Sequence, residues 1–431
     1  MTDKQSLPAG PPDERSTPQR GRVEAIPKKI VVTDFAVREQ RSLWGDAWRR
    51  LISSNAGRLG MAIVIFFLLG AVLSHFFWEY DPKTDLDYTL KLKAPGLRPT
   101  EEVETIHPFG TDKLGRDILC RVAHGGWNSL RVGLVAVGIS LTIGGLLGLA
   151  AGFYESMPLG RGGRAIIFGG VGLLLGGLSA WIAGQTFQMF LFVALGVAAV
   201  FLENLWVGKP ARLVLFAGVG LLLGGGPALL WISPYAAAMC GGLGLLAGVI
   251  VALPLGGPLF SNVIMRLMDI LLAFPGILLA IAIVAMLGPG LDKGMIAIGV
   301  VSIPVYARLT RSTVLSVIGE EYITASLAVG VGQGRILFRH ILPNTLSPVI
   351  VQTTMGLADA ILSAAALGFL GLGAIPPEPE WGAMLGDSYR FLTTGAWWAV
   401  MFPGLAIMLS VLGFNLLGDG LRDALDPRLQ I

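Results

Sequence analysis

The amino-acid sequence predicts an all-α membrane protein with about ten transmembrane helices. Hydrophobic residues make up 53% of its 431 residues and charged residues only 14%, whereas soluble proteins carry about 25% charged residues. Stretches of roughly 20 apolar residues, the length that crosses a bilayer, recur along the chain. They are Met61–Trp78, Leu130–Phe153, Ala165–Ala183, Phe190–Trp206, Leu213–Ile232, Ala236–Leu255, Leu267–Leu287, Met295–Ala307, Pro348–Leu372 and Trp397–Leu417.

The chain begins with a segment that has no apolar core. Residues 1–34 are rich in proline, arginine and charge, which argues against a signal peptide and predicts a disordered cytoplasmic tail. Residues 35–60 are expected to form an interfacial helix, because apolar side chains recur at helical spacing and arginines cover the remaining surface. The apolar side chains on this face are Leu43, Trp44, Ala47, Trp48 and Leu51.

Residues 61–156 form the first part of the predicted bundle, with an extracytoplasmic cap at 80–126 between its first two helices. The sidedness follows from the excess of Lys and Arg in cytoplasmic loops. Arg49, Arg50 and Arg58 precede the first predicted transmembrane helix and place the N-terminus in the cytoplasm. Counting helices forward puts the C-terminus there as well, so we expect a multi-pass membrane protein with both termini cytoplasmic.

An internal repeat marks residues 157–259 as an inserted membrane segment of four helices. The run RAIIFGGVGLLLGG begins at Arg164, and the similar run RLVLFAGVGLLLGG begins at Arg212. Each run leads to a Trp-Ile pair, which indicates a two-helix hairpin present twice. Both copies carry a GxxxG step, which lets helix backbones pack closely in lipid; a site for a lipid or a partner protein is the alternative. Since two hairpins add an even number of crossings, the sidedness of residues 260–431 does not change.

One charged segment, EEYITASLAVGVGQGRILFRHILPN, starts at Glu320 and separates two of the predicted transmembrane helices. Its charges exclude it from lipid. Thr324–Val329 and Gln333–Ile341 are expected to be short helices on either side of a glycine-rich step, and Pro343 is expected to end the second one. Such a rigid elbow on the cytoplasmic side suits docking into a groove of a partner. The alternative is a plain connector that positive charge anchors.

This loop resembles the EAA loop of ABC importer permeases, whose pattern is EAA, three residues, Gly, nine residues and I-x-L-P. Ala325, Gly330, Leu342 and Pro343 match that pattern. Thr324 and Ser326, at the two outer positions of the EAA triplet, do not match the pattern. Glu320 and Glu321, just before the triplet, are an alternative source of the negative charge that the family has at its first position. The resemblance predicts an ATPase-coupling site within the loop 320–343, formed by Glu320, Glu321, Thr324, Ala325, Ser326, Gly330, Arg335, Arg339, Leu342 and Pro343.

The resemblance extends beyond the loop to the dipeptide/oligopeptide (peptide/nickel) permease family. The similar segments, in the order of that family, are His107–Gly133, Met265–Val284, Phe338–Gln352, Ala366–Gly373, Pro376–Leu385 and Gly418–Arg428. The interfacial helix and the run GDGLRDALDPR resemble the second-permease type of the family. The resemblance implies a six-helix ABC importer permease core with the loop between its fourth and fifth helices, and residues 157–259 are the departure from it.

The resemblance also implies a function: a permease subunit of an ATP-driven ABC importer that moves di- or oligopeptides across the inner (plasma) membrane of a prokaryote. Nickel chelates, sugars and other peptide-like solutes are alternatives. Expected partners are a second permease in a heterodimer, two ABC ATPases, an extracytoplasmic substrate-binding protein and the lipid membrane, but no nucleic acid. The chain has no GxxxxGK[ST] motif, so we expect no enzyme activity and no cofactor bound by this chain, with ATP and Mg²⁺ used by the partner subunits.

Two acids lie in or near apolar stretches, where an ionisable residue is costly and often functional. Asp359 shares a helical face with Met355 and Ser363, and these residues are predicted either to line the translocation path or to pack against a polar partner. Asp269 lies three residues after Arg266, which predicts an ion pair at the membrane interface, and a role in transport is the alternative.

A charged group in the cap is the last candidate site. Asp112, Arg116 and Asp117 are expected to form local helix and turn contacts, and a contact with the binding protein is the alternative. The four histidines have no metal-ligand spacing, so no metal site is expected. The alternative function is a stand-alone secondary transporter, which would show inverted repeats and several embedded acids. A membrane enzyme or scaffold would need clustered catalytic residues or a soluble domain, and the sequence shows neither.

Overall fold

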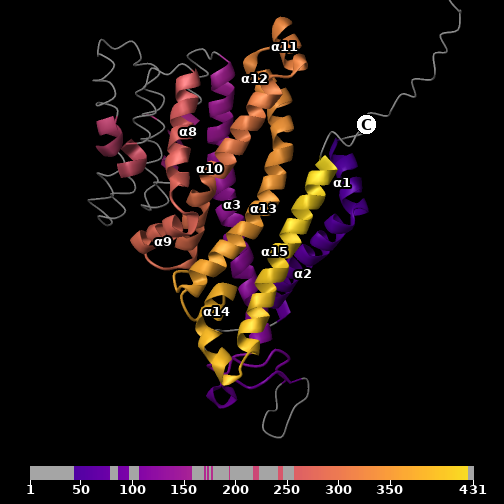
Figure 1. Cartoon of the computed structure of the whole chain (residues 1–431), viewed down its shortest axis with the longest axis vertical. Helices are drawn as coiled ribbons and strands as arrows, with labels where there is room; N and C mark the ends of the chain where they lie inside the picture. Colours follow the sequence, from indigo (N-terminus) through magenta and orange to yellow (C-terminus); the bar gives the residue numbers. More distant parts are fainter. Residues whose placement is uncertain are drawn as a thin grey trace, which may run out of the picture. The chain divides into compact units, whose positions relative to one another are not determined.

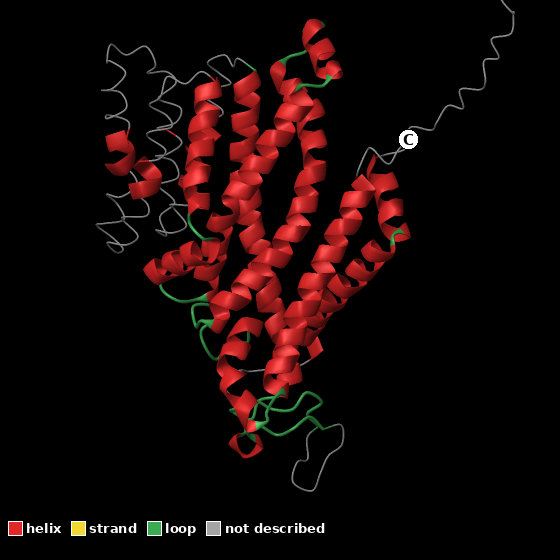
Figure 2. Cartoon of the chain, in the orientation of Figure 1, coloured by secondary structure: helices red, strands yellow, loops and turns green. Residues whose placement is uncertain are grey.

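The computed structural model describes residues 43–77, 86–96, 106–157 and 257–425, together with short helical pieces between 169 and 245. These residues form helices joined by turns, and no β-strand occurs among them (Figures 1 and 2). Five of the helices are long and apolar enough to cross a membrane, or six if a bent pair is counted as one crossing. The predicted all-α membrane fold is therefore confirmed. The tail at 1–34 and nearly all of the predicted insertion lie outside the described residues.

The first two helices are α1 (Leu43–Ser53) and α2 (Asn55–Phe77). Ala47 and Leu51 of α1 are buried in an apolar cluster with the end of the last helix of the chain. Trp48, between them in sequence, is 56% exposed. α1 therefore has one face on the protein and one face free, which is the arrangement that an interfacial helix needs.

α3 (Ile118–Ser156) is the longest described helix, with 39 residues. Asp117 caps it by accepting a 2.9 Å hydrogen bond from the amide of Cys120. The prediction began this helix at Leu130, so about three turns that were assigned to the cap and the loop after it belong to α3 instead. Those turns contain charged and polar residues such as Arg121. A search for apolar stretches therefore misses them, although they are helical.

α10 (Leu291–Ile318) packs along α3 through a seam of glycines. Gly144, Gly148 and Gly152 recur on one face of α3, and a Cβ atom at any of them would press on atoms of α10. Small residues at this spacing let two membrane helices approach closely. α10 is longer at both ends than the predicted stretch Met295–Ala307, because charged residues such as Asp292 and Arg308 continue the helix beyond the apolar stretch. Pro304 is accommodated inside it.

The predicted transmembrane helix Leu267–Leu287 is not one helix, so this prediction was wrong. Two helices, α8 (Gly257–Ala273) and α9 (Gly276–Leu287), meet there at an angle of 90°. Pro275 lies at the break, where it cannot donate a backbone hydrogen bond and pushes the residue before it out of the helical conformation. Figure 1 shows α9 lying across the direction of α8.

Three helices complete the bundle: α13 (Leu342–Phe369), the short α14 (Trp381–Ser388) and α15 (Trp398–Leu425). α15 packs along both α2 and α13, and α14 packs against α13 and α15. Two short 3-10 helices also occur, η1 (Tyr88–Leu90) before α3 and η4 (Tyr389–Thr394) directly after α14. The second part of the chain therefore closes the bundle against its first helices.

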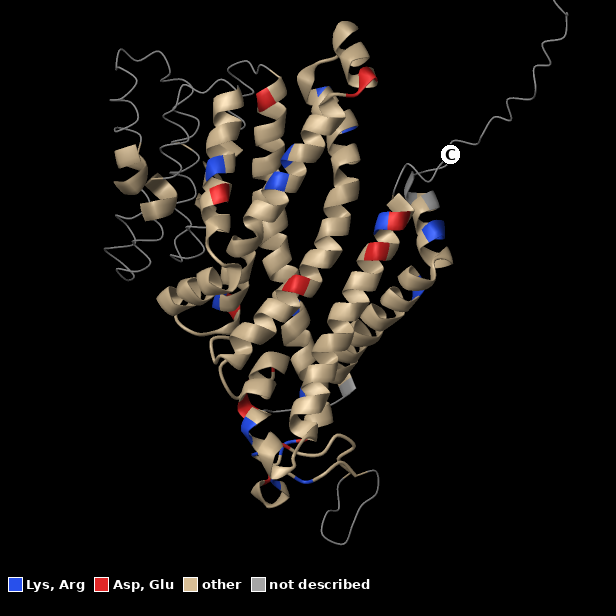
Figure 3. Ribbon diagram, in the orientation of Figure 1, with Lys and Arg blue, Asp and Glu red and all other residues tan. Residues whose placement is uncertain are grey.

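The described helices define two ends of the bundle. One end carries α11 (Glu321–Ala328) and α12 (Gln333–Ile336) and is called the elbow end. The other carries α14 and the cap, which comprises residues 86–96 and 106–117, and is called the cap end (Figure 1). Charged residues are sparse along the middle of the long helices and more frequent toward the two ends (Figure 3), as expected for a protein that spans lipid.

Candidate functional sites at the two ends of the bundle

The elbow, residues 320–341, turns at the glycine-rich step that the sequence pattern indicates. Gly330 has a φ angle of +81°, which glycine tolerates and other residues rarely adopt. The Gly330 amide donates to the Leu327 carbonyl and the Val331 amide donates to the Ser326 carbonyl, both at 3.0 Å. This pair of bonds is the Schellman motif, which ends a helix with its last carbonyls satisfied. α11 starts at Glu321, slightly earlier than predicted.

The second half of the elbow runs into α13 without a stop. α12 continues as a π-helical turn, η3 (Leu337–Ile341), and then as α13. The prediction that Pro343 ends the second helix was therefore wrong. A proline ring inside an α-helix clashes with the carbonyl group four residues earlier. The wider π-helical turn directly before Pro343 gives the ring the space that it needs.

Three buried isoleucines fasten the elbow to the bundle. Ile323 of α11, Ile336 of α12 and Ile341 of η3 are each 0% exposed. They pack in one apolar cluster with Phe153 near the end of α3 and Val314 near the end of α10. Burial of each such side chain is worth about 1.5–3 kcal/mol. The elbow is therefore held as a rigid extension of two membrane-spanning helices.

The outer surface of the elbow is rich in large apolar side chains. Val329 is 84% exposed, Phe338 68% and Leu327 44%. Figure 1 shows α11 projecting beyond the ends of the neighbouring helices. The sequence analysis did not single out these three residues, although large apolar side chains in a segment that is too charged for lipid are a signal for a contact surface.

The predicted coupling residues lie on or beside this surface. Ser326 and Leu342 are half-buried, and Ser326 Oγ donates a 2.7 Å hydrogen bond to the Tyr322 carbonyl. The others are exposed: Glu320, Glu321, Thr324, Ala325, Gly330, Arg335, Arg339 and Pro343. The structure thus brings two carboxylates, two guanidinium groups and an apolar surface together on one projecting element.

Tyr322 links the two halves of the elbow. Its hydroxyl accepts a 3.1 Å hydrogen bond from Asn344 Nδ2, and its ring centroid lies 6.1 Å from that of His340. Burial, and next the carboxylate of Glu320, raise the pKa of Tyr322 above its ordinary value. The phenol therefore stays neutral at physiological pH and remains a hydrogen-bond partner across the elbow.

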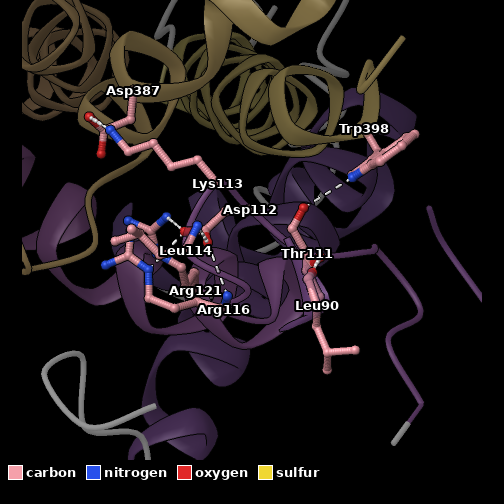
Figure 4. Close-up of polar contacts among 9 residues, drawn as sticks. All are labelled: Leu90, Thr111, Asp112, Lys113, Leu114, Arg116, Arg121, Asp387 and Trp398. Carbon is pink, nitrogen blue, oxygen red and sulfur yellow. Dashed lines mark hydrogen bonds and ion pairs between the residues drawn. The ribbon is translucent and has the colours of Figure 1, made fainter. Parts of the chain in front are cut away.

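The cap is held together by a buried cluster of charged side chains (Figure 4). Asp112 accepts hydrogen bonds from Arg116 Nε at 2.8 Å and from Arg121 Nη1 at 2.6 Å. All three residues are 2–3% exposed. The same carboxylate accepts a 2.8 Å hydrogen bond from the Leu114 amide. Charge-assisted bonds of this kind are directional, and removal of one buried partner is costly because it strands the others.

The cap is also tied to the last helices of the chain (Figure 4). Lys113 Nζ lies 2.8 Å from the carboxylate of Asp387 in α14. The indole N–H of Trp398 in α15 donates a 3.2 Å hydrogen bond to the Thr111 carbonyl. The cap is therefore fixed relative to α14 and α15 by polar contacts across a sequence separation of more than 250 residues.

Asp112, Arg116 and Asp117 form local contacts in the cap, which was one of the two roles that the sequence left open for them. Asp112 and Arg116 are buried in the charge cluster, so their side chains are not on a surface that a delivery protein could touch. Asp117 caps α3 and lies 2.7 Å from His107 Nδ1. Arg121, the second cationic partner of Asp112, was missed, because its spacing of nine residues from the acid has no local signature.

α14 is positioned by a buried carboxylate that the sequence analysis did not single out. Glu380 is 1% exposed and accepts 2.8 Å hydrogen bonds from the amides of Gly382 and Ala383, which caps α14. Ser129 Oγ of α3 donates to the same side chain at 3.4 Å. Burial raises the pKa of Glu380 above its ordinary value. The signal in the sequence was an acid directly before a short helix that follows a proline-rich run.

Two neighbouring hollows open at the cap end, and the larger one lies beside α14. Their volumes are about 650 Å³ and about 440 Å³, and they share Pro289 in their walls. The larger contains the pair Lys113–Asp387, and the smaller contains Arg131 and Asp292, 3.6 Å apart. Because each wall carries both signs of charge, either hollow offers partners to the ionic groups of a solute or of a protein loop.

The residues predicted for the translocation path lie on α13. Asp359 is exposed, and Met355 and Ser363 are half-buried. Asp359 occupies a position well inside the membrane-spanning range 333–369. An exposed carboxylate at that depth is disfavoured against lipid and calls for a polar environment.

Asp269 forms the predicted ion pair and a closer one besides. Its carboxylate lies 3.9 Å from Arg266 Nη1 on the same helix and 2.8 Å from Arg308 Nη2 on α10. The side chains are about half exposed or more. The pair therefore connects α8 to α10 at the protein surface, and the sequence could not indicate the partner on the other helix.

Comparison with family models agrees with these features of a multi-pass helical membrane protein with a rigid projecting elbow. Residues 244–431 match the family described as binding-protein-dependent transport system inner membrane component. Residues 42–95 match the N-terminal transmembrane domain of oligopeptide transport permease C. The class is therefore that of the membrane components of binding-protein-dependent transport systems.

Relatives cover almost the whole chain. The dipeptide transport system permease protein of Alkalihalophilus pseudofirmus is 36% identical over 394 residues, 90% of this chain and 91% of the relative. The di/tripeptide transport system permease protein of Pseudomonas aeruginosa is 36% identical over 385 residues, 89% and 92% of the two chains. The glutathione transport system permease protein of Pectobacterium atrosepticum is 31% identical over 405 residues, 94% and 98% of the two chains. The chain belongs to the peptide permease family of ABC importers.

Membership of this family establishes what the chain is. It is a transmembrane permease subunit of an ABC importer, a multi-pass inner-membrane protein in a complex with ATPase subunits and a binding protein. ATP hydrolysis belongs to the separate ATPase subunits. A stand-alone secondary transporter, the alternative that the sequence left open, is thereby set aside.

Proposed function

We propose that this permease subunit imports di- or oligopeptides and that its elbow receives the movement of the partner ATPases. The observation that carries the proposal is the elbow itself, a projecting element with an apolar and charged surface that buried isoleucines fasten to α3 and α10. The chain has no P-loop motif, so the energy of the nucleotide has to arrive from another subunit. No cofactor is expected in this chain, and ATP with Mg²⁺ is expected in the partners.

The surface of the elbow fits a groove on a partner protein. Val329 and Phe338 are large, apolar and exposed, which suits them as anchors in an apolar groove. The guanidinium groups of Arg335 and Arg339 and the nearby carboxylates would form a charged rim, as protein interfaces commonly have. The predicted coupling residues of the loop 320–343 are therefore proposed as the docking site of an ABC ATPase.

This assignment sets the sidedness of the chain. The elbow end lies in the cytoplasm, and both termini lie there as well, in agreement with the arginines that precede and begin α2. The cap end then faces outward, where the binding protein delivers the solute beside the hollows at α14. The second permease subunit forms a heterodimer with this one, and one ATPase serves each of the two permeases.

The proposed translocation path includes Met355, Asp359 and Ser363. Asp359 is exposed within the membrane-spanning range of α13, and lipid is an unfavourable environment for a carboxylate. A water-filled path between this chain and the second permease supplies the polar surroundings that the carboxylate requires. Helix packing against a polar group of that second permease is the alternative role of Asp359.

The proposed cargo follows from the names of the relatives. They are transport proteins for dipeptides, for di- and tripeptides and for glutathione, all small molecules that contain peptide bonds. Nickel chelates and sugars are the alternatives that the resemblance to the peptide/nickel family leaves. Uptake of a labelled dipeptide and of a labelled nickel chelate by the complete complex in proteoliposomes distinguishes these classes.

The elbow assignment is tested by Gly330→Pro. Proline requires a φ angle near −65°, whereas Gly330 has +81°, so the substitution should distort the elbow and lower ATP-driven uptake by about tenfold or more. The matched control is Gly334→Ala, because a Cβ atom there has open space. Uptake is measured in proteoliposomes with equal amounts of assembled complex. Normal uptake by the Gly330→Pro complex would refute the role of the elbow.

A further inference from the structure

A ring of polar contacts joins three helices near the elbow end. Arg311 of α10 donates from Nε to Ser261 Oγ of α8 at 2.7 Å, and from Nη2 to Glu155 Oε2 of α3 at 2.8 Å. Ser261 Oγ in turn donates to Glu155 Oε2 at 2.7 Å. Each helix contributes one side chain, and each side chain contacts the other two. These three residues are called the polar ring.

The polar ring is well enclosed by the protein. Ser261 is 0% exposed, and the side chains of Glu155 and Arg311 are 27% and 24% exposed. Beside it, Tyr154 of α3 packs edge-on against Phe260 of α8 with ring centroids 5.4 Å apart. A charge-assisted contact that is largely shielded from water is stronger and more directional than one on the surface.

The same segments of α3 and α10 hold the elbow. Phe153, two residues before Glu155, and Val314, three residues after Arg311, are members of the apolar cluster that buries the elbow isoleucines. The backbone of α3 also lies close to α10 here, since a Cβ atom at Gly152 would be 3.0 Å from the Val314 side chain. Movement of the elbow therefore reaches the ends of α3 and α10 directly.

α8 is joined to this pair of helices by the polar ring. The isoleucine cluster that holds the elbow contains no residue of α8 among the described residues, so α8 has to be linked to it through α3 and α10. Beyond the ring, α8 leads to the 90° bend at its junction with α9. A firm joint at Ser261 would make α8 move together with the elbow, and would carry that movement to the bend.

We infer that the polar ring Glu155–Ser261–Arg311 is the joint that passes movement of the elbow to α8, so that its residues are positioning residues for ATP-coupled transport. The inference rests on the proposed role of the elbow as the ATPase docking site. The ring holds three helices at their elbow ends as one body. Without it, ATP hydrolysis would still move the elbow, α3 and α10, but α8 would follow incompletely.

The chain offers a matched control in a second link between α8 and α10. Asp269 and Arg308 join the same two helices at 2.8 Å, but their side chains are 48% and 56% exposed. An exposed ion pair contributes little to holding helices together, because water and salt screen it. Asp269→Asn therefore removes a charged contact between the same helices without touching the ring.

The first experiment measures peptide imported per ATP hydrolysed by the complete complex in proteoliposomes. Arg311→Gln should lower this ratio at least about fivefold, and so should the double variant Glu155→Gln with Arg311→Gln, which leaves no buried charge unpaired and so preserves the fold. Asp269→Asn should stay within about twofold of the parent. A parental ratio in the double variant, or an equal loss in Asp269→Asn, overturns the inference.

The second experiment follows the movement itself. Spin labels at Ala328→Cys on the elbow and Leu259→Cys on α8, both exposed positions outside the proposed anchors, are placed in a chain with Cys120 and Cys240 replaced by serine. With the ring intact, the distance between the labels should stay the same with and without bound nucleotide, and in the double variant it should change. A nucleotide-dependent distance in the parent chain overturns the inference.

The two proposals fail in different ways. If Gly330→Pro retains the parental ratio of import to hydrolysis, the role of the elbow fails, and the ring loses its purpose with it. If Gly330→Pro abolishes coupling while the double ring variant keeps the parental ratio, the elbow assignment stands and the ring is only structural.

Discussion

The elbow and the cap are attached to the helices of the bundle by different forces. At the elbow end, buried isoleucines pack against α3 and α10, and no charged side chain belongs to their cluster. At the cap end, a buried carboxylate holds two arginines, and Glu380 is buried at the start of α14. Apolar packing is non-directional, whereas buried charged contacts demand one geometry.

The two kinds of contact differ in how much movement they tolerate. An element held by apolar packing can shift slightly as a unit without breaking a specific bond. An element held by buried charges has one favourable arrangement, because any displacement leaves a charge unpaired. The elbow, which is proposed to follow the ATPases, has the tolerant kind of contact with α3 and α10, whereas the polar ring joins those helices to α8. The cap end has the restrictive kind and serves as a fixed frame.

The largest effect is expected from Asp112→Ala. It would leave Arg116 and Arg121 buried without their shared carboxylate, which typically costs about 3–5 kcal/mol. The measurement is the yield of folded protein and its unfolding temperature in detergent. Asp387→Asn, which breaks the part-exposed pair with Lys113, is the control and should cost about 0–1 kcal/mol. Equal stability of the two variants would contradict the claim that buried charges hold the cap in one geometry.

Ile336→Ala should have the next largest effect, and a different one. Removing a fully buried isoleucine side chain costs about 2–5 kcal/mol, but the loss is confined to the attachment of the elbow. Hydrogen exchange should therefore rise in residues 320–341 and not in the cap, and ATP-driven uptake should fall. If exchange rose equally in the cap, the two ends would not be independent.

Phe338→Ala tests the outer surface of the same element. The side chain is 68% exposed, so its removal should change the stability of the chain by less than about 0.5 kcal/mol. As an anchor of the docking surface, it should weaken binding of the ATPase pair by about 1–2 kcal/mol. Titration of the reconstituted permease pair with ATPase measures this. Unchanged affinity would move the docking surface away from Phe338.

The smallest effect is the pH dependence that Glu380 confers on the cap end. Burial raises its pKa in the folded protein, so between the ordinary glutamate value, about 4.5, and the raised value the folded state binds more protons than the unfolded state. Its contribution to stability is therefore present below that range and is lost as pH rises through it. Unfolding temperatures of wild type and Glu380→Gln, compared from pH 4 upward, should converge or cross in favour of the variant. Parallel curves would contradict this.

Local patterns predicted much of the fold. The apolar stretches marked the spanning segments, and the glycine-rich step marked the elbow turn, because hydropathy and backbone freedom are properties of neighbouring residues. Two local predictions were wrong. Leu267–Leu287 breaks at Pro275, and Pro343 continues a helix. In both cases the helix breaks or continues according to whether its surroundings accommodate the proline ring. The presence of a proline in the sequence does not decide this.

The residues of the candidate sites also fall into two groups, those that a local sequence pattern indicates and those whose partners lie far away in the sequence. The proposed coupling residues were indicated by a linear motif. The apolar residues that hold the elbow were not, because their partners Phe153 and Val314 lie on other helices. Likewise, the spacing of Asp112 and Arg116 was visible as four residues along the chain, whereas the ring of Glu155, Ser261 and Arg311 joins residues up to 156 positions apart.

The sequence by itself determined that this chain is a helical membrane protein with a charged elbow that turns at glycines, because lipid selects for apolar length and excludes charge one segment at a time. Only the tertiary structure decided which charges are buried, which are paired and which are exposed. Those states depend on helices that are distant in sequence packing side by side, since desolvation and hydrogen-bond geometry are set by what surrounds a group in space.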